Sequence, residues 1–250
     1  MRGRARRTVG HAAALPLVAA AVAGCLPHVV TTEGQRTAQL YGILVAIAAV
    51  VVVIVLGLTL FAIIRYRRRP GDDSLPEQVH GNIRYEVVWT GIPILTIAAL
   101  LVMTVLVLNT FNDAVKASAA VDIRVTAFRW GWRFEYPSER VVVEGIGEPG
   151  PEVWVPVDEN VHVTLTGADV IHAFFVPQFL FKRDAIPGHE TEFAFTVDEP
   201  GSYRGQCAEF CGIGHSRMPF TVVASSRAEY EAWLDAHRGT PSPLATGATP

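Results

Sequence analysis

The sequence predicts a membrane hairpin of two helices followed by an all-β domain of the sandwich or barrel type. Two uncharged apolar stretches in the first half are each long enough to cross a bilayer. The second half instead contains short segments rich in valine, threonine and aromatic residues, separated by Gly, Pro, Asn and Asp. The mean hydropathy of +0.29 is high for a purely soluble protein.

The charged residues divide the chain into a basic front and an acidic back. Residues 1–108 contain 10 Lys/Arg and 5 Asp/Glu, a net charge of +5. Residues 109–250 contain 11 Lys/Arg and 19 Asp/Glu, a net charge of −8. This division argues for two environments and against nucleic-acid binding. The three cysteines are too few for a disulfide scaffold.

The N-terminus has the pattern of an export signal over residues 1–24. Basic residues ("MRGRARR") are followed by a short apolar stretch that ends in small residues. The ending "VAGC" resembles a bacterial lipoprotein box, in which Cys25 would be lipidated and become the mature N-terminus. An ordinary signal peptide or an uncleaved apolar arm is the alternative. Residues 25–39 would then be an exposed segment before the membrane.

Residues 40–64 and 87–108 are the predicted transmembrane helices. The first run is followed by four arginines within residues 65–69, which mark the cytoplasmic side by the positive-inside rule. Pro93 lies near the start of the second run, where a spanning helix tolerates it. Residues 65–86 are therefore a cytoplasmic loop, and the chain after the second helix lies outside the cytoplasm. The alternative is a soluble protein with two buried helices, but uncharged runs of this length are rare in soluble cores.

Residues 109–225 form the predicted β-domain. Segments such as "VDIRVTAFRW" and "NVHVTLTGA" alternate apolar and polar residues, and "GIGEPGP" and "DEPGS" separate them as turns. Many short strands with such turns indicate a sandwich or a barrel.

A short helix is expected after the β-domain. Ser226 and Glu229 have the spacing of a capping box, which predicts a helix over residues 226–238. The remaining residues, 239–250, are rich in Gly, Pro, Ser and Thr and are predicted to be a disordered tail.

Four soft metal-binding side chains lie within twelve positions near the end of the β-domain, namely Cys207, Cys211, His215 and Met218. Thiolate, imidazole and thioether together are the ligands of electron-transfer copper. Structural zinc sites rarely use methionine. The sequence contains no Cys-x-x-Cys-His motif for haem attachment.

These residues alone are compatible with three kinds of site. A disulfide between the two cysteines is allowed outside the cytoplasm, but it leaves the histidine and methionine unexplained. A mononuclear blue-copper site needs one Cys, two His and a weak Met, and His172 in "GADVIHAFFVP" is well placed to be the second imidazole. With both cysteines included, the same residues suit two copper ions bridged by both sulfurs.

The stretch resembles the copper A loop of cytochrome c oxidase subunit II, Cys-x-Glu-x-Cys-x-x-x-His-x-x-Met. The segment "DVIHAFFVPQFLFKRDAIPG" also resembles this family, and the likeness covers nearly the whole chain after the signal. The resemblance implies a cupredoxin-like Greek-key barrel or sandwich over residues 109–225. It implies that the ligands of the two copper ions are His172, Cys207, Glu209 (by its main-chain carbonyl), Cys211, His215 and Met218.

The resemblance also implies roles for residues outside the sulfur cluster. The side chain of Glu209 would reach a magnesium ion shared with subunit I, since a carboxylate suits this hard cation. In "AFRWGWRFEYP", Trp130 would be the residue at which the electron enters. Arg129 and Gly131 depart from the family pattern, which commonly has Gln and an aromatic residue there. Glu86 would lie at the cytoplasmic mouth of a proton path into subunit I.

The resemblance implies a subunit of a proton-translocating cytochrome c oxidase in the bacterial plasma membrane. Electrons would come from cytochrome c, or from a membrane-bound c-type cytochrome, and pass through copper A to haem a of subunit I. Subunit I would also hold haem a3 and copper B, where oxygen is reduced to water, and subunit III would be a further partner. The copper domain would face outward, and its acidic charge fits a basic donor.

Two other functions compete with this interpretation. A membrane-tethered copper-delivery protein would need labile, exposed ligands, whereas the apolar neighbours of these cysteines favour a buried pair. A quinol oxidase subunit II would share the fold without the copper ligands, yet all six ligand positions are filled here.

Overall fold

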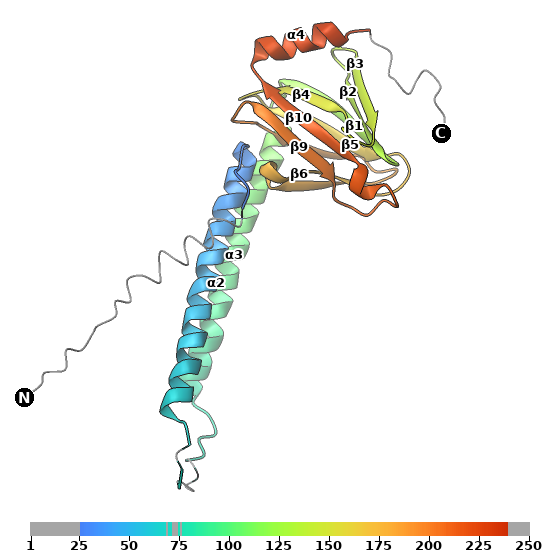
Figure 1. Cartoon of the computed structure of the whole chain (residues 1–250). Coiled ribbons are helices and arrows are strands. Elements are labelled where there is room, and N and C mark those ends of the chain that lie inside the picture. The colour runs from blue at the N-terminus through green and yellow to red at the C-terminus, as the bar shows by residue number, and fades with distance from the viewer. Residues whose placement is uncertain (1–25, 69, 72–74, 76, 240–250) are drawn as a thin grey trace, which may run out of the picture.

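The chain folds into a long helical hairpin that carries a β-domain at one end. The computed structural model describes residues 26–68, 70–71, 75 and 77–239. The N-terminal export signal, Cys25 and the tail from residue 240 onward therefore lie outside the described residues. The hairpin and the β-domain form two distinct parts of the molecule (Figure 1).

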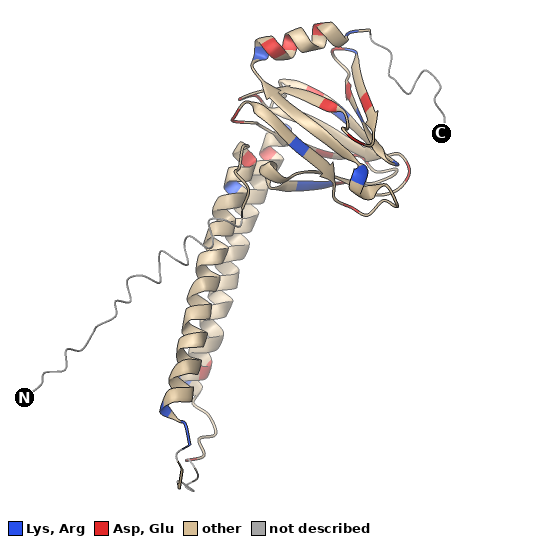
Figure 2. Ribbon diagram, in the orientation of Figure 1, with Lys and Arg blue, Asp and Glu red and all other residues tan. Residues whose placement is uncertain are grey.

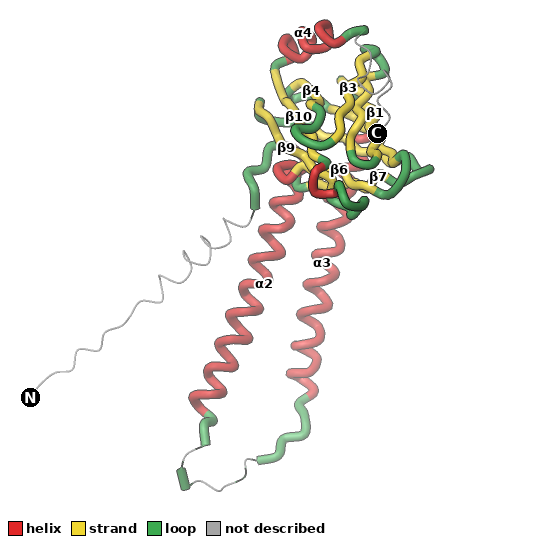
Figure 3. Tube along the Cα trace, turned by 45° about the vertical axis from the view of Figure 1, so that its right-hand side comes forward, coloured by secondary structure: helices red, strands yellow, loops and turns green. Residues whose placement is uncertain are grey.

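Helices α2 (Thr32–Arg65) and α3 (Ile83–Lys116) form the hairpin. They run antiparallel, approach each other near the β-domain and diverge toward the connecting loop (Figure 3). Each has 34 residues, so at a rise of 1.5 Å per residue each is about 51 Å long and exceeds the ~30 Å hydrocarbon core of a bilayer.

Both helices begin before the apolar runs at 40–64 and 87–108, because polar caps set their starts. Thr31 Oγ1 accepts a hydrogen bond from the amide of Gly34, and Asn82 Oδ1 accepts one from the amide of Arg84. The most apolar part of each helix is not buried by the rest of the protein. The predicted hairpin is thus present, with polar residues added at the start of both helices and at the end of α3.

The β-domain consists of two five-stranded sheets. One has the order β3-β2-β1-β5-β8 and the other the order β4-β10-β9-β6-β7. Most neighbouring strands are antiparallel, whereas β1 pairs with β5 and β4 pairs with β10 in parallel. The strands are β1 Val121–Phe128, β2 Gly131–Tyr136, β3 Val141–Ile146, β4 Glu152–Pro156, β5 Val161–Gly167, β6 His172–Val176, β7 Phe181–Ala185, β8 Thr191–Phe195, β9 Gly201–Cys207 and β10 Pro219–Ser225.

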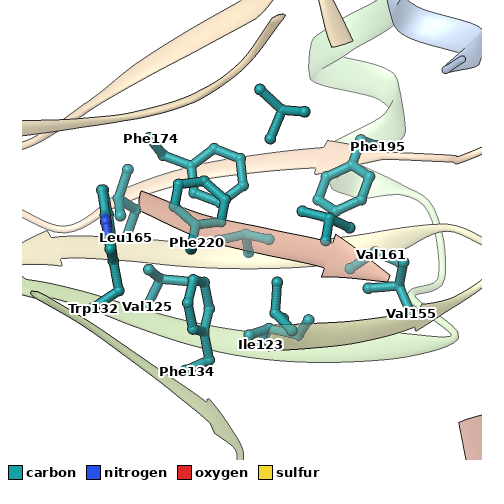
Figure 4. Packing of buried hydrophobic residues seen from close by; sticks show 14 of the residues in the cluster. Ile123, Val125, Trp132, Phe134, Val155, Val161, Leu165, Phe174, Phe195 and Phe220 are labelled. Carbon is teal, nitrogen blue, oxygen red and sulfur yellow. The ribbon is translucent and has the colours of Figure 1, made fainter. Parts of the chain in front are cut away.

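The core lies between the two sheets and is rich in aromatic rings. The Trp132 and Phe134 side chains of one sheet face Phe174 and Phe220 of the other (Figure 4). The ring centroids are 5.0 Å apart for Trp132 and Phe220, and 4.6 Å apart for Phe174 and Phe220. Strand β1 alternates buried and outward-facing residues along its length, as a half-buried strand should. The predicted sandwich is confirmed.

The segment before α2 fastens the hairpin to the β-domain. The amide of Val30 donates to the carbonyl of Gln178 at 3.2 Å, and the amide of Asp198 donates to the carbonyl of Val30 at 2.9 Å. The Asp198 carboxylate then accepts hydrogen bonds from Thr32 Oγ1 at 2.7 Å and Gln35 Nε2 at 2.8 Å. These contacts tie the first turn of α2 to the loop between β8 and β9.

Helix α4 (Arg227–His237) lies across the far side of the β-domain from the hairpin (Figure 1). Its predicted capping box is confirmed, because Ser226 Oγ accepts from the Glu229 amide while the Glu229 carboxylate accepts from the Ser226 amide. Trp233 stacks on Trp154, with ring centroids 5.7 Å apart.

Candidate metal centre

The sulfur-rich cluster occupies the loop between β9 and β10, at one end of the sandwich. Cys207 is the last residue of β9 and Met218 directly precedes β10. The Cys207 amide donates to the Met218 carbonyl at 3.2 Å and closes the loop. Strand β6 pairs with β9 so that Phe174 lies opposite Cys207. This pairing brings His172, the first residue of β6, to the loop from 35 residues upstream.

The two thiols lie side by side, and each faces one imidazole. The Sγ atoms of Cys207 and Cys211 are 3.8 Å apart. The Nδ1 atom of His172 lies 3.8 Å from Cys207 Sγ, and the Nδ1 atom of His215 lies 3.7 Å from Cys211 Sγ. Ligand atoms of His172, Cys207 and Cys211 all lie within 4.8 Å of one another, so these residues could hold a metal ion.

Two further ligand atoms complete the cluster, one beside each sulfur. Met218 Sδ lies 3.9 Å from Cys211 Sγ, and the main-chain carbonyl oxygen of Glu209 lies 3.3 Å from Cys207 Sγ. His172 and Met218 are 0% and 1% exposed. Strand β6 and the β9–β10 loop therefore bring all six sequence-predicted ligands into one connected group of contacts.

The cysteines are a free pair in this structure, and their electrostatics favour a bound cation. Their sulfurs are too far apart for a disulfide, whose bond is about 2.05 Å long. Although burial opposes ionisation of Cys207, its contact with His172 lowers its pKa below the usual thiol range. Burial and the neighbouring Cys207 sulfur raise the pKa of Cys211. Two adjacent thiolates are therefore unfavourable unless a soft metal ion lies between them.

Asp169 orients the His172 ring. His172 Nε2 lies 2.9 Å from Asp169 Oδ1, so a proton on Nε2 leaves the Nδ1 lone pair directed at the sulfurs. Although partial burial opposes ionisation of Asp169, hydrogen bonds from His172 and from the amides of Val170 and Arg129 hold its pKa well below the usual range. Arg129 also places its Nε 3.1 Å from Asp169 Oδ2. Sequence reasoning missed Asp169, although it stands three residues before a candidate ligand.

Trp130 and Trp132 each donate a hydrogen bond to the backbone of the metal loop. Trp130 Nε1 donates to the carbonyl of Cys211 at 3.2 Å, and Trp132 Nε1 donates to the carbonyl of Met218 at 3.1 Å. A Cβ at Gly214 would overlap the half-buried Trp130 ring, so the loop passes directly beneath that indole. Trp132 is fully buried and belongs to the aromatic core.

The Glu209 side chain leaves the sulfur cluster and joins an ion-pair network. Its Oε1 atom lies 2.6 Å from Lys182 Nζ, and the same ammonium lies 3.1 Å from Asp184 Oδ1. The hydrogen bond with Glu209, followed by that with Asp184, raises the pKa of Lys182. The main chain and the side chain of Glu209 thus have different partners. Its carbonyl oxygen faces the Cys207 sulfur, and its carboxylate faces the Lys182 ammonium.

One predicted functional residue, Glu86, does not join this site. Glu86 lies in the first turn of α3, at the opposite end of the hairpin from the β-domain, and its Oε1 accepts a hydrogen bond from the Asn82 amide at 3.2 Å. The position of Cys25 lies outside the described residues.

Two family models match the chain, one over the hairpin and one over the part of the β-domain from β4 to β10. Residues 25–114 match "Cytochrome C oxidase subunit II, transmembrane domain". Residues 147–225 match "Cytochrome C oxidase subunit II, periplasmic domain". Together these segments cover more than half of the chain, and they include the hairpin and the metal loop.

Similar proteins carry the same description. Cytochrome c oxidase subunit 2 of Alkalihalophilus pseudofirmus is 37% identical over 197 residues, which cover 76% of this chain and 55% of that protein. Cytochrome c oxidase subunit 2 of Cereibacter sphaeroides is 35% identical over 229 residues, which cover 79% of this chain and 74% of that protein. The chain thus spans about half the length of the first relative and three quarters of the second.

A solved structure is also similar. The periplasmic domain of subunit II of cytochrome oxidase of Bradyrhizobium japonicum is 34% identical, with a TM-score of 0.47, and the match covers 49% of this chain and 96% of that one. The family matches over the hairpin and the β-domain establish that this is a membrane protein with a C-terminal cupredoxin-like domain. The chain belongs to the cytochrome c oxidase subunit II family.

Proposed function

We propose that this chain is the electron-entry subunit of a cytochrome c oxidase that binds a dinuclear copper centre in its β9–β10 loop. It would accept electrons from a c-type cytochrome and pass them to haem a of subunit I, where oxygen is reduced to water and protons are pumped. The observation that carries the proposal is the free cysteine pair with sulfurs 3.8 Å apart, in which each sulfur faces its own histidine.

The donor set fits a pair of copper ions better than a single ion. His172 and His215 would be terminal ligands, one on each copper, and the two cysteine sulfurs would bridge. Met218 and the carbonyl of Glu209 would be weak ligands beside opposite sulfurs. Such a copper pair would take up and release one electron at a time. The protein itself would keep water out and hold the ligands rigid, because the site is enclosed by β-sheet and tryptophan side chains.

Other roles in this proposal rest on the position of single residues. The Glu209 carboxylate would exchange its pairing with Lys182 for a magnesium ion shared with subunit I, which metal analysis of a Glu209→Gln complex would test. Trp130, in contact with the loop, would be the electron-entry residue. Glu86 would serve a proton path, so Glu86→Gln should slow turnover while the copper content stays unchanged.

The arginines after α2 support an orientation with the copper domain on the outer face of the bacterial plasma membrane. Lipidation of Cys25 would add a second anchor there, and mass spectrometry of the mature N-terminus would detect a diacylated cysteine. Subunit III would complete the complex. An unmodified N-terminal residue elsewhere would exclude the lipid anchor.

The copper content of the purified protein tests the central proposal. We expect two copper ions per chain and an electron paramagnetic resonance spectrum in which one unpaired electron is shared by both. One colourless Cu(I) per chain would instead indicate a copper-delivery protein. A single Cu(II) with an ordinary blue-copper spectrum would contradict the dinuclear assignment.

Asp169→Asn should weaken copper binding and shift the reduction potential. Loss of the carboxylate that orients a metal-binding histidine typically costs about 10- to 100-fold in metal affinity. The potential should rise, because a negative charge near the centre opposes electron uptake. Competition with a chelator and a potentiometric titration measure the two effects. Asp122→Asn is the control, since it makes the same change at a carboxylate that contacts His162, which is not a candidate ligand. Equal behaviour of the two variants would contradict the role of Asp169.

A further inference from the structure

Large hydrophobic side chains are exposed at one end of the β-domain. Within described residues 117–239, four such side chains are exposed: Ile146 at 55%, Ile171 at 47%, Phe210 at 81% and Ile213 at 86%. Single exposed hydrophobic residues are ordinary, but a group gathered at one place is typical of a contact surface.

Two of the four flank Trp130. The loop at Gly214 passes beneath the indole, and Ile213 directly precedes this glycine. The amide of Gly147 donates to the carbonyl of Trp130 at 3.2 Å, and Ile146 directly precedes Gly147. The two exposed isoleucines therefore each adjoin a glycine that contacts Trp130.

The other two adjoin the metal-facing histidines. Ile171 directly precedes His172, and the Phe210 ring centroid lies 5.9 Å from that of His215. Each of the four side chains thus lies next to a residue through which an electron would reach the metal centre, or next to a residue in contact with one. We name this surface the entry face, consisting of Trp130, Ile146, Ile171, Phe210, Ile213 and Arg217.

The carboxylates near the entry face are already paired within the protein. Asp169 Oδ2 lies 3.1 Å from Arg129 Nε, and Glu148 Oε1 lies 2.7 Å from Arg204 Nη2. Each of these pairs carries no net charge, so neither presents a free acid to a partner. The acid in the metal loop, Glu209, pairs with Lys182 on β7. Because Lys182 also pairs with Asp184, this group of three keeps one negative charge, on the β7 side of the loop.

The free charge on the entry face is positive. Arg217 lies in the short helix η3 (His215–Arg217), and its side chain is exposed. It makes no ion pair with any residue in the part of the chain that the structure describes. The backbone carbonyl of Arg217 lies 4.0 Å from the position of a Cβ at Gly147, so this arginine adjoins the Trp130 side of the face.

The net charge of −8 over residues 109–250 therefore does not describe the entry face. Several of its acidic residues are on α4, at the far side of the β-domain from the hairpin (Figure 2). Charges separated by more than about 8 Å are largely screened at physiological ionic strength. The expected match between the acidic domain and a basic donor thus finds no support at the place where contact would occur.

We propose that the entry face docks an electron-donor protein whose contact surface is apolar and bears carboxylates, in place of a ring of lysines. This rests on the proposed function of the metal centre. In each encounter one ferrous haem of the donor would become ferric, and one electron would pass through the Trp130 region to the metal centre, with no proton transferred. Apolar contact would supply adhesion, and the arginine would orient the donor.

Electron-transfer kinetics with two donors test this proposal. The purified oxidase complex is mixed with a lysine-rich c-type cytochrome or with a c-type cytochrome whose haem-edge surface is acidic, at increasing ionic strength. We expect the lysine-rich donor to react more slowly at low salt, and its rate to stay flat or rise as salt increases. The acidic donor should show the opposite salt dependence, because screening weakens attraction as well as repulsion.

Arg217→Glu should reverse the salt dependence of the rate for each of the two donors. The lysine-rich donor should gain about tenfold in rate at low salt, which is the lower end of the range for electrostatic steering. Arg140→Glu is the matched control, because Arg140 is also exposed and lies at the opposite end of the β2–β3 hairpin from Ile146. Ile146→Ser should slow both donors without changing their salt dependence, since it removes apolar contact and no charge.

Three outcomes would overturn the proposal. The first is a wild-type rate that is highest with the lysine-rich donor and falls with salt. The second is equal effects of Arg217→Glu and Arg140→Glu. The third is loss of the other oxidase subunits on purification of the Arg217 or Ile146 variants, which would mean that a neighbouring subunit covers the face.

Copper analysis and turnover with a small redox dye separate this test from that of the proposed function. If copper is absent from the wild-type complex, the proposed function itself fails. If copper and dye turnover are normal in every variant but the donor kinetics do not change as expected, only the docking proposal fails.

Discussion

Cys207→Ser is expected to remove the dinuclear copper centre and to reduce turnover with a c-type cytochrome to background. A serine hydroxyl is a hard, neutral ligand at neutral pH and cannot replace a bridging thiolate for copper. The Cys211 sulfur would keep its own imidazole, His215 at 3.7 Å, but would lose the second sulfur beside it. Copper per chain should fall from two to at most one, and the shared-electron resonance should disappear. Metal analysis and electron paramagnetic resonance of the purified complex measure both changes.

The chain provides a matched control in its third cysteine. Cys25→Ser makes the same chemical change outside the metal loop, so copper content and resonance should match those of the unmodified protein. Retention of both coppers and of full activity in Cys207→Ser would contradict the assignment. Co-purification of subunit I with each variant checks that loss of activity comes from the site and not from failed assembly.

Trp132→Ala is expected to cause the largest loss of stability among single core changes near the site. The side chain is fully buried, and its ring lies 5.0 Å from that of Phe220 and 6.2 Å from that of Phe174. Truncation of a buried tryptophan to alanine typically costs about 3–5 kcal/mol in the free energy of unfolding. It would also free the Met218 carbonyl from the indole at 3.1 Å, so copper binding should weaken together with stability.

Trp132→Phe separates these two effects. Phenylalanine keeps part of the ring packing but has no N–H group and leaves a small cavity, so its cost should be about 2 kcal/mol, between that of one hydrogen bond and that of truncation to alanine. For a domain of this size each kcal/mol lowers the unfolding midpoint by about 2–4 °C. Thermal unfolding of the purified complex should therefore rank unmodified protein, Trp132→Phe and Trp132→Ala in falling order. Equal midpoints for all three would show that the ring adds little to the core.

The hairpin, the β-domain and most of the metal loop could be predicted from the sequence because their signals are local. Uncharged apolar runs specify spanning helices wherever they occur, and the capping box of Ser226 and Glu229 specifies the start of α4. The spacing from Cys207 to Met218 placed five candidate ligands in one short segment, which spans at most about 40 Å even when fully extended. For these features the order of residue types is enough.

Other features depend on how distant strands align, and the tertiary structure decided them. The ionic contact between Arg129 and Asp169 spans 40 residues, and no spacing rule connects the two positions. The same holds for Glu209 and Lys182, 27 residues apart, where the sequence suggested instead a carboxylate directed at magnesium. Sheet register depends on the packing of whole faces, so a one-residue shift would exchange inward and outward side chains.

The sequence by itself determined the class of the protein and its metal-binding residue types, through local apolar runs and the spacing of soft ligands. The total acidic charge of the second half does not say where on the β-domain the acids lie, because a sum over residues carries no positions. Only the tertiary structure brought the segments that carry Ile146 and Ile213 to Trp130, placed Phe210 beside His215, and paired the nearby acids. The physical reason is that the residues of one surface come from segments far apart in the sequence. Strand pairing and sheet packing bring these segments together, and neither can be derived from local sequence patterns.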